Sequence, residues 1–119
     1  MTISNLSQLR QSFGIPDDKL KCIKAFIQGS VYCWIKNRKD EIFAARDLMG
    51  GENFYWEGTP LMALYEKHIA LGKSSKDSVA EAGKDFGWIL KLVLHEDKRI
   101  FESYDIDIVK GYKWNGQEA

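Results

Sequence analysis

The sequence predicts a single, mainly helical α+β domain built around one central apolar helix, with a small β-hairpin at the C-terminus. Residues 86–94 are large and apolar at seven of nine positions, and a helix that is apolar on most sides must be buried on most sides. Residues 104–114 change to a two-residue alternation of apolar and polar side chains, which is typical of a half-buried strand. The chain has 119 residues, the usual size of one domain and enough to bury a core without disulfides.

The N-terminal part of the chain predicts two helices. Residues 1–15 form a short helical arm that a glycine ends. A longer helix begins after Pro16 with two acidic residues, which the helix dipole favours at that end. Its apolar residues keep three- and four-residue steps through Gly29, so we favour one helix to about residue 35. The rival interpretation is a change from helix to strand at residues 31–35, where β-prone residues gather.

The middle of the chain predicts short elements that lead into another helix. Residues 41–45 are interpreted as a short strand, and residues 46–51 predict a helical turn that ends on glycines. A loop follows over residues 52–58, with three consecutive aromatic side chains. Thr59 and Pro60 then open a helix, because threonine is a good cap and proline suits the first helical position.

The apolar run of residues 86–94 belongs to the next helix, for which Ser74 is the predicted cap. Gly83 and Gly87 interrupt the pattern, so it predicts either one helix or two helices with a bend.

The C-terminal segment, residues 100–114, predicts a hairpin or a bent strand, with a turn or bulge at residues 110–111. Residues 115–119 predict a loose tail. Helices, a short strand, further helices and a terminal hairpin together give the element order of a winged-helix domain, which is an analogy of order alone.

The same periodicities predict which apolar side chains form the core. The predicted core residues are Leu20, Ile23, Ile27, Leu64, Phe86, Ile89, Leu90, Val93, Ile106 and Ile108.

Composition limits the classes of partner. Basic and acidic residues both number 17, so the formal net charge is zero and no overall basic field for nucleic acid exists. Cys22 and Cys33 are too far apart on one helix for a disulfide, and we interpret them as buried free thiols in a reducing compartment. No apolar segment of the sequence is long enough to span a bilayer. We therefore expect a cytoplasmic protein that does not bind membranes.

The sequence shows no signature of catalysis, of a metal site or of a cofactor. The imidazoles, His68 and His95, have no nucleophile beside them in sequence. Their spacing from the two cysteines fits no zinc motif. Glycine-rich phosphate loops are also absent from the sequence. These observations predict that the protein is not an enzyme.

DNA binding is the weaker of two functional hypotheses. Residues 82–88 have glycines near the spacing of a helix-turn-helix, but the helix that follows offers few polar side chains to reach base edges. DNA contact by the C-terminal hairpin requires less, because the hairpin combines basic and aromatic side chains as a wing or a stacking surface would. The candidate nucleic-acid-binding residues are Lys91, Lys98, Arg99, Lys110 and Lys113.

The favoured hypothesis is a small binding protein that acts through a protein partner as a regulator, inhibitor or subunit. It rests on the neutral charge, the missing catalytic motifs and the aromatic loop of Phe54, Tyr55 and Trp56, because exposed aromatic rings dominate binding hot spots. The rival interpretation of these rings is that they cap the core. The predicted partner-binding residues are Tyr55, Trp56, Glu57, Tyr112 and Trp114. The sequence leaves the oligomeric state open.

Overall fold

The protein is a mainly helical α+β domain that ends in a two-stranded antiparallel hairpin. The structure, a computed structural model, describes residues 15–38, 40–49, 56–106 and 109–118, so residues 1–14 of the predicted N-terminal arm lie outside these ranges. The elements of the described part are α2 (Asp17–Arg38), α3 (Ala45–Leu48), α4 (Met62–Ala70), α5 (Ser75–Glu96), β1 (Arg99–Ile106) and β2 (Val109–Glu118).

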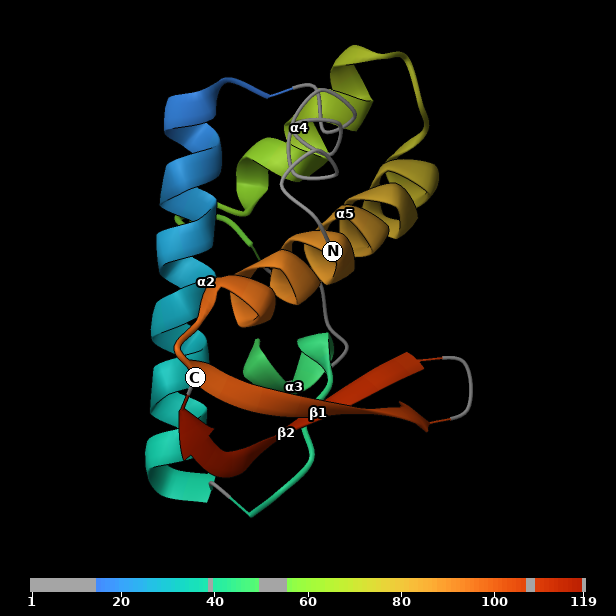
Figure 1. Cartoon of the computed structure of the whole chain (residues 1–119). Helices are drawn as coiled ribbons and strands as arrows, with labels where there is room; N and C mark the ends of the chain where they lie inside the picture. The colour runs from blue at the N-terminus through green and yellow to red at the C-terminus, as the bar shows by residue number, and fades with distance from the viewer. Residues whose placement is uncertain (1–14, 39, 50–55, 107–108, 119) are drawn as a thin grey trace.

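Helix α5 is the centre of the fold, as the apolar run predicts. It crosses the molecule between α4 and the hairpin, with α2 along one side (Figure 1), and it contacts α2, α3, α4 and β1. Its C-terminal half buries three consecutive side chains, those of residues 92–94. Trp88 and Lys91 lie on an exposed stripe of this helix. The glycines at 83 and 87 do not divide α5, so the prediction of one helix is the correct one of the two.

Local signals set the helix ends near the predicted positions. The Ser74 hydroxyl accepts a hydrogen bond from the backbone N–H of Asp77 at 3.1 Å, which caps α5. The Thr59 hydroxyl accepts one from the backbone N–H of Leu61 at 3.2 Å, and α4 begins one residue later at Met62. Helix α2 runs unbroken through Gly29, so the rival strand at residues 31–35 is wrong.

The hairpin differs from its predicted turn. Lys110 pairs with Asp105 and Gly111 with Tyr104 in the ladder, so the prediction of a turn at residues 110–111 is wrong. The alternation continues through this point because the chain reverses between Ile106 and Val109. Strand β2 also continues through residues 115–118, where the sequence predicts a loose tail. The predicted short strand at 41–45 is reduced to a single bridge between Phe43 and Tyr112.

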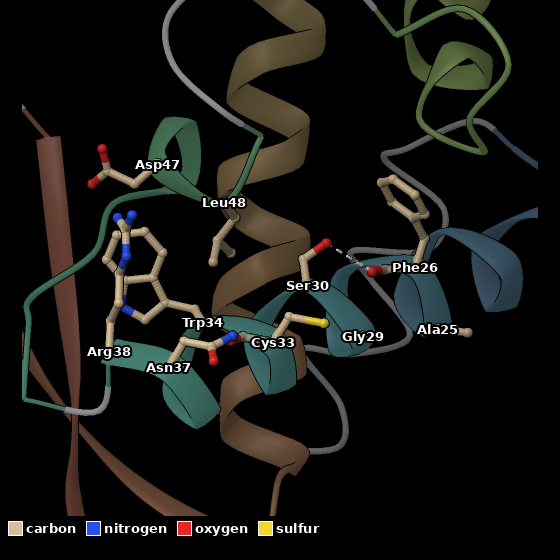
Figure 2. Close-up of a pocket in the computed structure, with 10 residues that line it drawn as sticks. All are labelled: Ala25, Phe26, Gly29, Ser30, Cys33, Trp34, Asn37, Arg38, Asp47 and Leu48. Atoms are coloured by element: carbon tan, nitrogen blue, oxygen red, sulfur yellow. Dashed lines mark hydrogen bonds between the residues drawn. The ribbon is translucent and has the colours of Figure 1, made fainter.

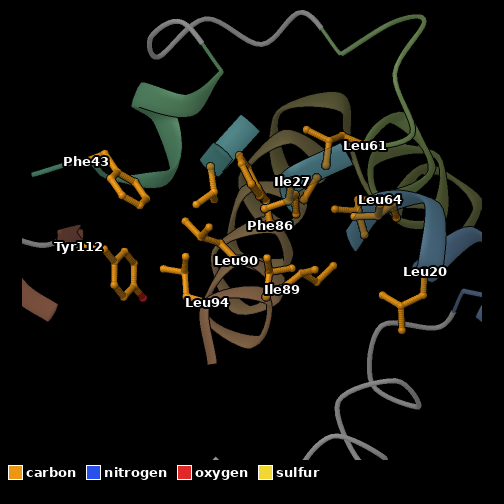
Figure 3. Packing of buried hydrophobic residues seen from close by; sticks show 14 of the residues in the cluster. Leu20, Ile27, Phe43, Leu61, Leu64, Phe86, Ile89, Leu90, Leu94 and Tyr112 are labelled. Atoms are coloured by element: carbon orange, nitrogen blue, oxygen red, sulfur yellow. The ribbon is translucent and has the colours of Figure 1, made fainter. Parts of the chain in front are cut away.

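The core forms where α2, α4 and α5 meet, and it extends to the hairpin (Figure 3). The predicted core is confirmed at Leu20, Ile23, Ile27, Leu64, Phe86, Ile89, Leu90 and Val93. The side chains of Ile106 and Ile108 lie outside the described residues. At the hairpin end, the ring of Phe43 contacts those of Trp34, Phe101 and Tyr112 at centroid distances of 5.8–6.2 Å.

Two other interpretations need correction. Both cysteines of α2 are exposed, because each is one or two positions away from a buried residue of the helix and therefore points to another side. Residues 82–88, which have helix-turn-helix spacing, lie inside α5 without a turn. The fold therefore keeps only the element order of the winged-helix analogy.

Candidate functional site

The structure buries two of the predicted partner-binding rings. Trp56 is 8% exposed and packs edge-on against Phe86 at a centroid distance of 5.9 Å. Tyr112 is also 8% exposed and bonds to Phe43 through both backbone groups, at 2.7 and 2.8 Å. The prediction that these two rings are exposed anchors is therefore wrong. Large aromatic surfaces gain more free energy in the core, and these two plug its ends.

The other predicted partner-binding residues that the structure describes, Glu57 and Trp114, do not form one surface with Trp56 and Tyr112. Trp114 is half-buried against the core, and its indole N–H donates to the carbonyl of Gln117 at 2.9 Å. Glu57 is exposed in the turn before α4, and Tyr55 lies outside the described residues. Trp56 packs on α5 whereas Trp114 belongs to β2, so the predicted set is divided between two regions.

The predicted nucleic-acid-binding cations of the hairpin have acidic or aromatic partners. Lys110 contacts Asp105 at 2.6 Å, and Lys113 lies opposite Glu102 in the ladder. Arg99 contacts the Asp97 carboxylate at 3.4 Å, and its guanidinium lies 5.9 Å from the ring of Tyr32. The carboxylates offset much of the positive charge that a phosphate backbone would need.

The other two candidates for nucleic-acid contact come from α5 and its end. The Lys91 ammonium lies 5.2 Å from the ring centre of Trp88, and Lys98 is exposed just before β1. The structure therefore places these cations on the helix and its end, not in the hairpin ladder.

Two groups of the hairpin have shifted protonation equilibria. The hydrogen bond and charge of Lys110 lower the pKa of the Asp105 carboxyl, and the same contact raises the pKa of the Lys110 ammonium. Burial raises the pKa of the Tyr112 phenol. Each shift has a structural cause, which is the ion pair for Asp105 and Lys110 and burial for Tyr112.

A groove of about 940 Å³ runs along α2 beside α3 (Figure 2). Most of its lining comes from one side of α2, and the rest from α3. The lining residues are Ala25, Phe26, Gly29, Ser30, Cys33, Trp34, Asn37, Arg38, Asp47 and Leu48.

The groove owes its hollow shape to the order of large and small residues. The rings of Phe26 and Trp34 stand at two points along α2, and the small residues Gly29, Ser30 and Cys33 lie between them (Figure 2). Leu48 of α3 lines the groove from the other side. A large apolar side chain from another molecule would therefore meet an aromatic or aliphatic wall at the ends and a shallow floor between them.

One end of the groove is polar. The guanidinium of Arg38 lies 4.9 Å from the ring centre of Trp34 and 3.8 Å from the carboxylate of Glu41. The Asn37 amide donates to the carbonyl of Cys33 at 3.0 Å. Asp47 accepts the backbone N–H of Ala44 at 2.8 Å, which holds the start of α3. The groove thus combines an apolar middle with charged groups at its α3 end.

Sequence reasoning did not find this groove. The helical spacing correctly places α2 on the core, but the interpretation of the cysteines as buried is wrong, and Cys33 lines the groove. The groove also needs Leu48 beside α2, which is a tertiary contact that no spacing reveals. The available signal in the sequence is the pair of small residues at 29–30 between two aromatic residues of one predicted helix, Phe26 and Trp34.

Other site types find no support among the described residues. Within the described ranges, no group of three or more possible metal ligands comes together. In the same part of the chain, every helix is too short or too polar to cross a membrane. No protein-family model, curated protein or solved structure matches the chain. The groove geometry is therefore the basis for the functional proposal.

Proposed function

We propose that this chain is a small non-catalytic binding protein that receives an amphipathic helix of a protein partner in the groove between α2 and α3. The observation that supports this proposal is the aromatic-walled groove with a floor of small residues. It replaces the predicted aromatic anchors, two of which are buried.

The length and shape of the groove suit a helix. Residues 25–38 of α2 cover about 20 Å at the usual helical rise, which matches a partner helix of three to four turns. Helices bound in grooves contribute apolar side chains at positions i, i+3 or i+4, and i+7. Such a row would fill the space between Phe26 and Trp34, against Leu48.

Charge at the groove is balanced. The lining carries one cation and one carboxylate, Arg38 and Asp47, which gives 1 − 1 = 0, and Arg38 also lies 3.8 Å from the carboxylate of Glu41. The aromatic and aliphatic walls are therefore the main binding feature of the groove. We propose an amphipathic helix that binds through its apolar stripe.

We also propose a cytoplasmic location. Cys22 and Cys33 are exposed, and Cys33 lines the groove. A reducing compartment keeps exposed thiols free and available for contact with a partner.

A displayed library of amphipathic helices, selected on the immobilised protein, tests the proposal. A Cβ at Gly29 meets no atom within 4 Å, so Gly29→Leu places its side chain in the groove, and Gly83→Leu makes the same change on α5 outside the groove. We expect helices with an apolar stripe to be enriched, to bind wild type and Gly83→Leu alike, and to bind Gly29→Leu at least tenfold more weakly. Equal binding to all three proteins, or no enrichment of such helices, would contradict the proposal.

The alternative proposal, a winged-helix-like DNA-binding regulator, depends on the hairpin cations. It receives less support because Lys110 and Arg99 contact carboxylates. A gel-shift assay at low salt decides between the two. Binding that falls steeply with salt and is weakened by Lys113→Gln would favour DNA, and no shift would remove this alternative.

A further inference from the structure

A second site lies at the C-terminal end of α4, where a buried histidine connects three charged side chains. His68 is 6% exposed, and its Nε2 lies 2.9 Å from Oδ2 of Asp85 on α5. The ammonium of Lys67 contacts the same carboxylate oxygen at 2.6 Å. On the other side of the ring, the Lys73 ammonium lies 2.7 Å from Nδ1 of His68.

These contacts define the hydrogen positions on the ring. An ammonium group only donates hydrogen bonds and a carboxylate only accepts them. Nδ1 must therefore accept from Lys73, and the Nε2 hydrogen is donated to Asp85. The imidazole in this arrangement is uncharged, so the positive charge of Lys73 meets a neutral ring.

The end of α4 holds Lys73 in this position. Gly72 has φ of 87°, and its N–H donates to the carbonyl of Ile69 at 2.9 Å. The N–H of Lys73 donates to the carbonyl of His68 at 3.3 Å. This pattern of two bonds around a left-handed glycine is the Schellman motif, which reverses the chain at a helix end. It brings the Lys73 side chain back over the imidazole.

A pocket of about 590 Å³ opens at this point. It is lined from the start of α2, from α4 and from the loop after α4. The lining residues are Ile15, Pro16, Lys19, Ala63, Glu66, Lys67, His68, Ala70, Leu71 and Lys73. The lining therefore includes Lys67, His68 and Lys73 but not Asp85, the carboxylate with which Lys67 and His68 pair.

The lining carries an excess of positive charge. It includes three ammonium groups and one carboxylate, and the Asp85 carboxylate behind it pairs with Lys67, which gives 3 − 2 = +1 with a neutral His68. The Lys73 ammonium contacts the imidazole, and within the described part of the chain neither Lys73 nor Lys19 pairs with a carboxylate. The other side of the pocket is apolar, and it includes Leu71, which is 68% exposed.

We propose that this pocket binds a small organic anion with an apolar body and a carboxylate or phosphate head. The head group accepts hydrogen bonds from Lys73 and Lys19, since charge-assisted bonds are among the strong ones. The apolar body covers Ile15, Pro16 and Leu71. The volume lies within the range of about 300–1,000 Å³ that small-molecule sites have. This site is separate from the groove and does not depend on the proposed function.

Titration of the full chain with four probes tests the proposal: octanoate, octyl phosphate, octanol and inorganic phosphate, each below the concentration at which it forms micelles. Binding is followed by isothermal calorimetry and by the NMR signals of the His68 ring. We expect at least one of the two amphiphilic anions to bind saturably and to shift the His68 signals. Octanol lacks the head group and phosphate lacks the apolar body, so both should bind at least tenfold more weakly. A preference between octanoate and octyl phosphate identifies the head group.

Matched variants assign the binding to the pocket. Lys73→Gln and Lys19→Gln should each weaken the amphiphile at least tenfold, whereas Lys76→Gln, an exposed lysine of α5 outside the lining, should not. Lys19 is exposed and supports no described contact, so its variant keeps the test valid if Lys73→Gln unfolds the protein. The proposal is wrong if neither amphiphile binds, if octanol binds equally well, or if both lysine variants bind like wild type.

Discussion

Replacing Gly29 with alanine tests whether the groove of α2 is open. A Cβ at this position meets no atom within 4 Å, and its backbone lies in the interior of a helix. Alanine is favoured over glycine there by about 0.5–1 kcal/mol, because glycine loses more conformational freedom on folding. For 119 residues, the usual unfolding entropy per residue converts this gain to a rise in melting temperature of about 2–4 °C.

Calorimetry and urea unfolding of three alanine variants measure this effect. Gly83→Ala should stabilise to the same degree, since it also lies in a helix with open space around a Cβ. Gly72→Ala should destabilise, because its φ of 87° suits glycine. If Gly29→Ala lowered the melting temperature while Gly83→Ala raised it, another part of the protein would fill the groove. The proposal of a free docking groove would then be refuted.

Three further predictions concern the core and the hairpin. Leu90→Ala should destabilise the protein by about 2–5 kcal/mol, because this α5 side chain is 1% exposed; unchanged urea unfolding would contradict the central position of α5. Trp56→Ala should cost about 3–5 kcal/mol through the lost packing on Phe86, whereas a surface anchor would leave stability unchanged. Lys110→Gln should return the pKa of the Asp105 carboxyl upward to its ordinary range, which an NMR pH titration measures. Because the pKa of Asp105 is lowered in the folded wild type, its contact with Lys110 stabilises the folded state at pH values above the ordinary carboxyl pKa. This stabilisation is lost as the pH falls through the lowered pKa. An unchanged Asp105 titration in Lys110→Gln would show that Lys110 does not cause the shift.

Periodicity predicts the helices and the core because burial repeats with the geometry of each element. The steps through Leu20, Ile23 and Ile27 identify the face of α2 that packs on the core, and the apolar run identifies α5 as central. Periodicity predicts the hairpin turn poorly. The alternation continues across both strands, so it gives no signal for the reversal between Ile106 and Val109.

Exposure is the property that the sequence predicts least well. Trp56 and Cys33 show this in opposite directions, since the first is buried against Phe86 and the second is exposed in the groove. A loop has no periodicity to orient a ring, and a small residue at the edge of a buried stripe is covered only if another element packs there. Both outcomes depend on contacts between distant segments. For the same reason the link between His68 and Asp85, 17 residues apart on two helices, has no signal in local spacing.

The proposed helix-binding groove and the proposed anion pocket both include residues of α2, and we expect them to act independently. Lys19 lies in the first turn of the helix, and the groove begins at Ala25. Coupling between two sites requires an element that both ligands move between two arrangements. The core-facing side of α2 is buried along its length, from Leu20 to Ile35, and it packs against α5. A helix packed in this way resists displacement, because close-packed cores resist small changes. The energetic contributions of the two sites should therefore add, as they do for distant sites with no shared partner.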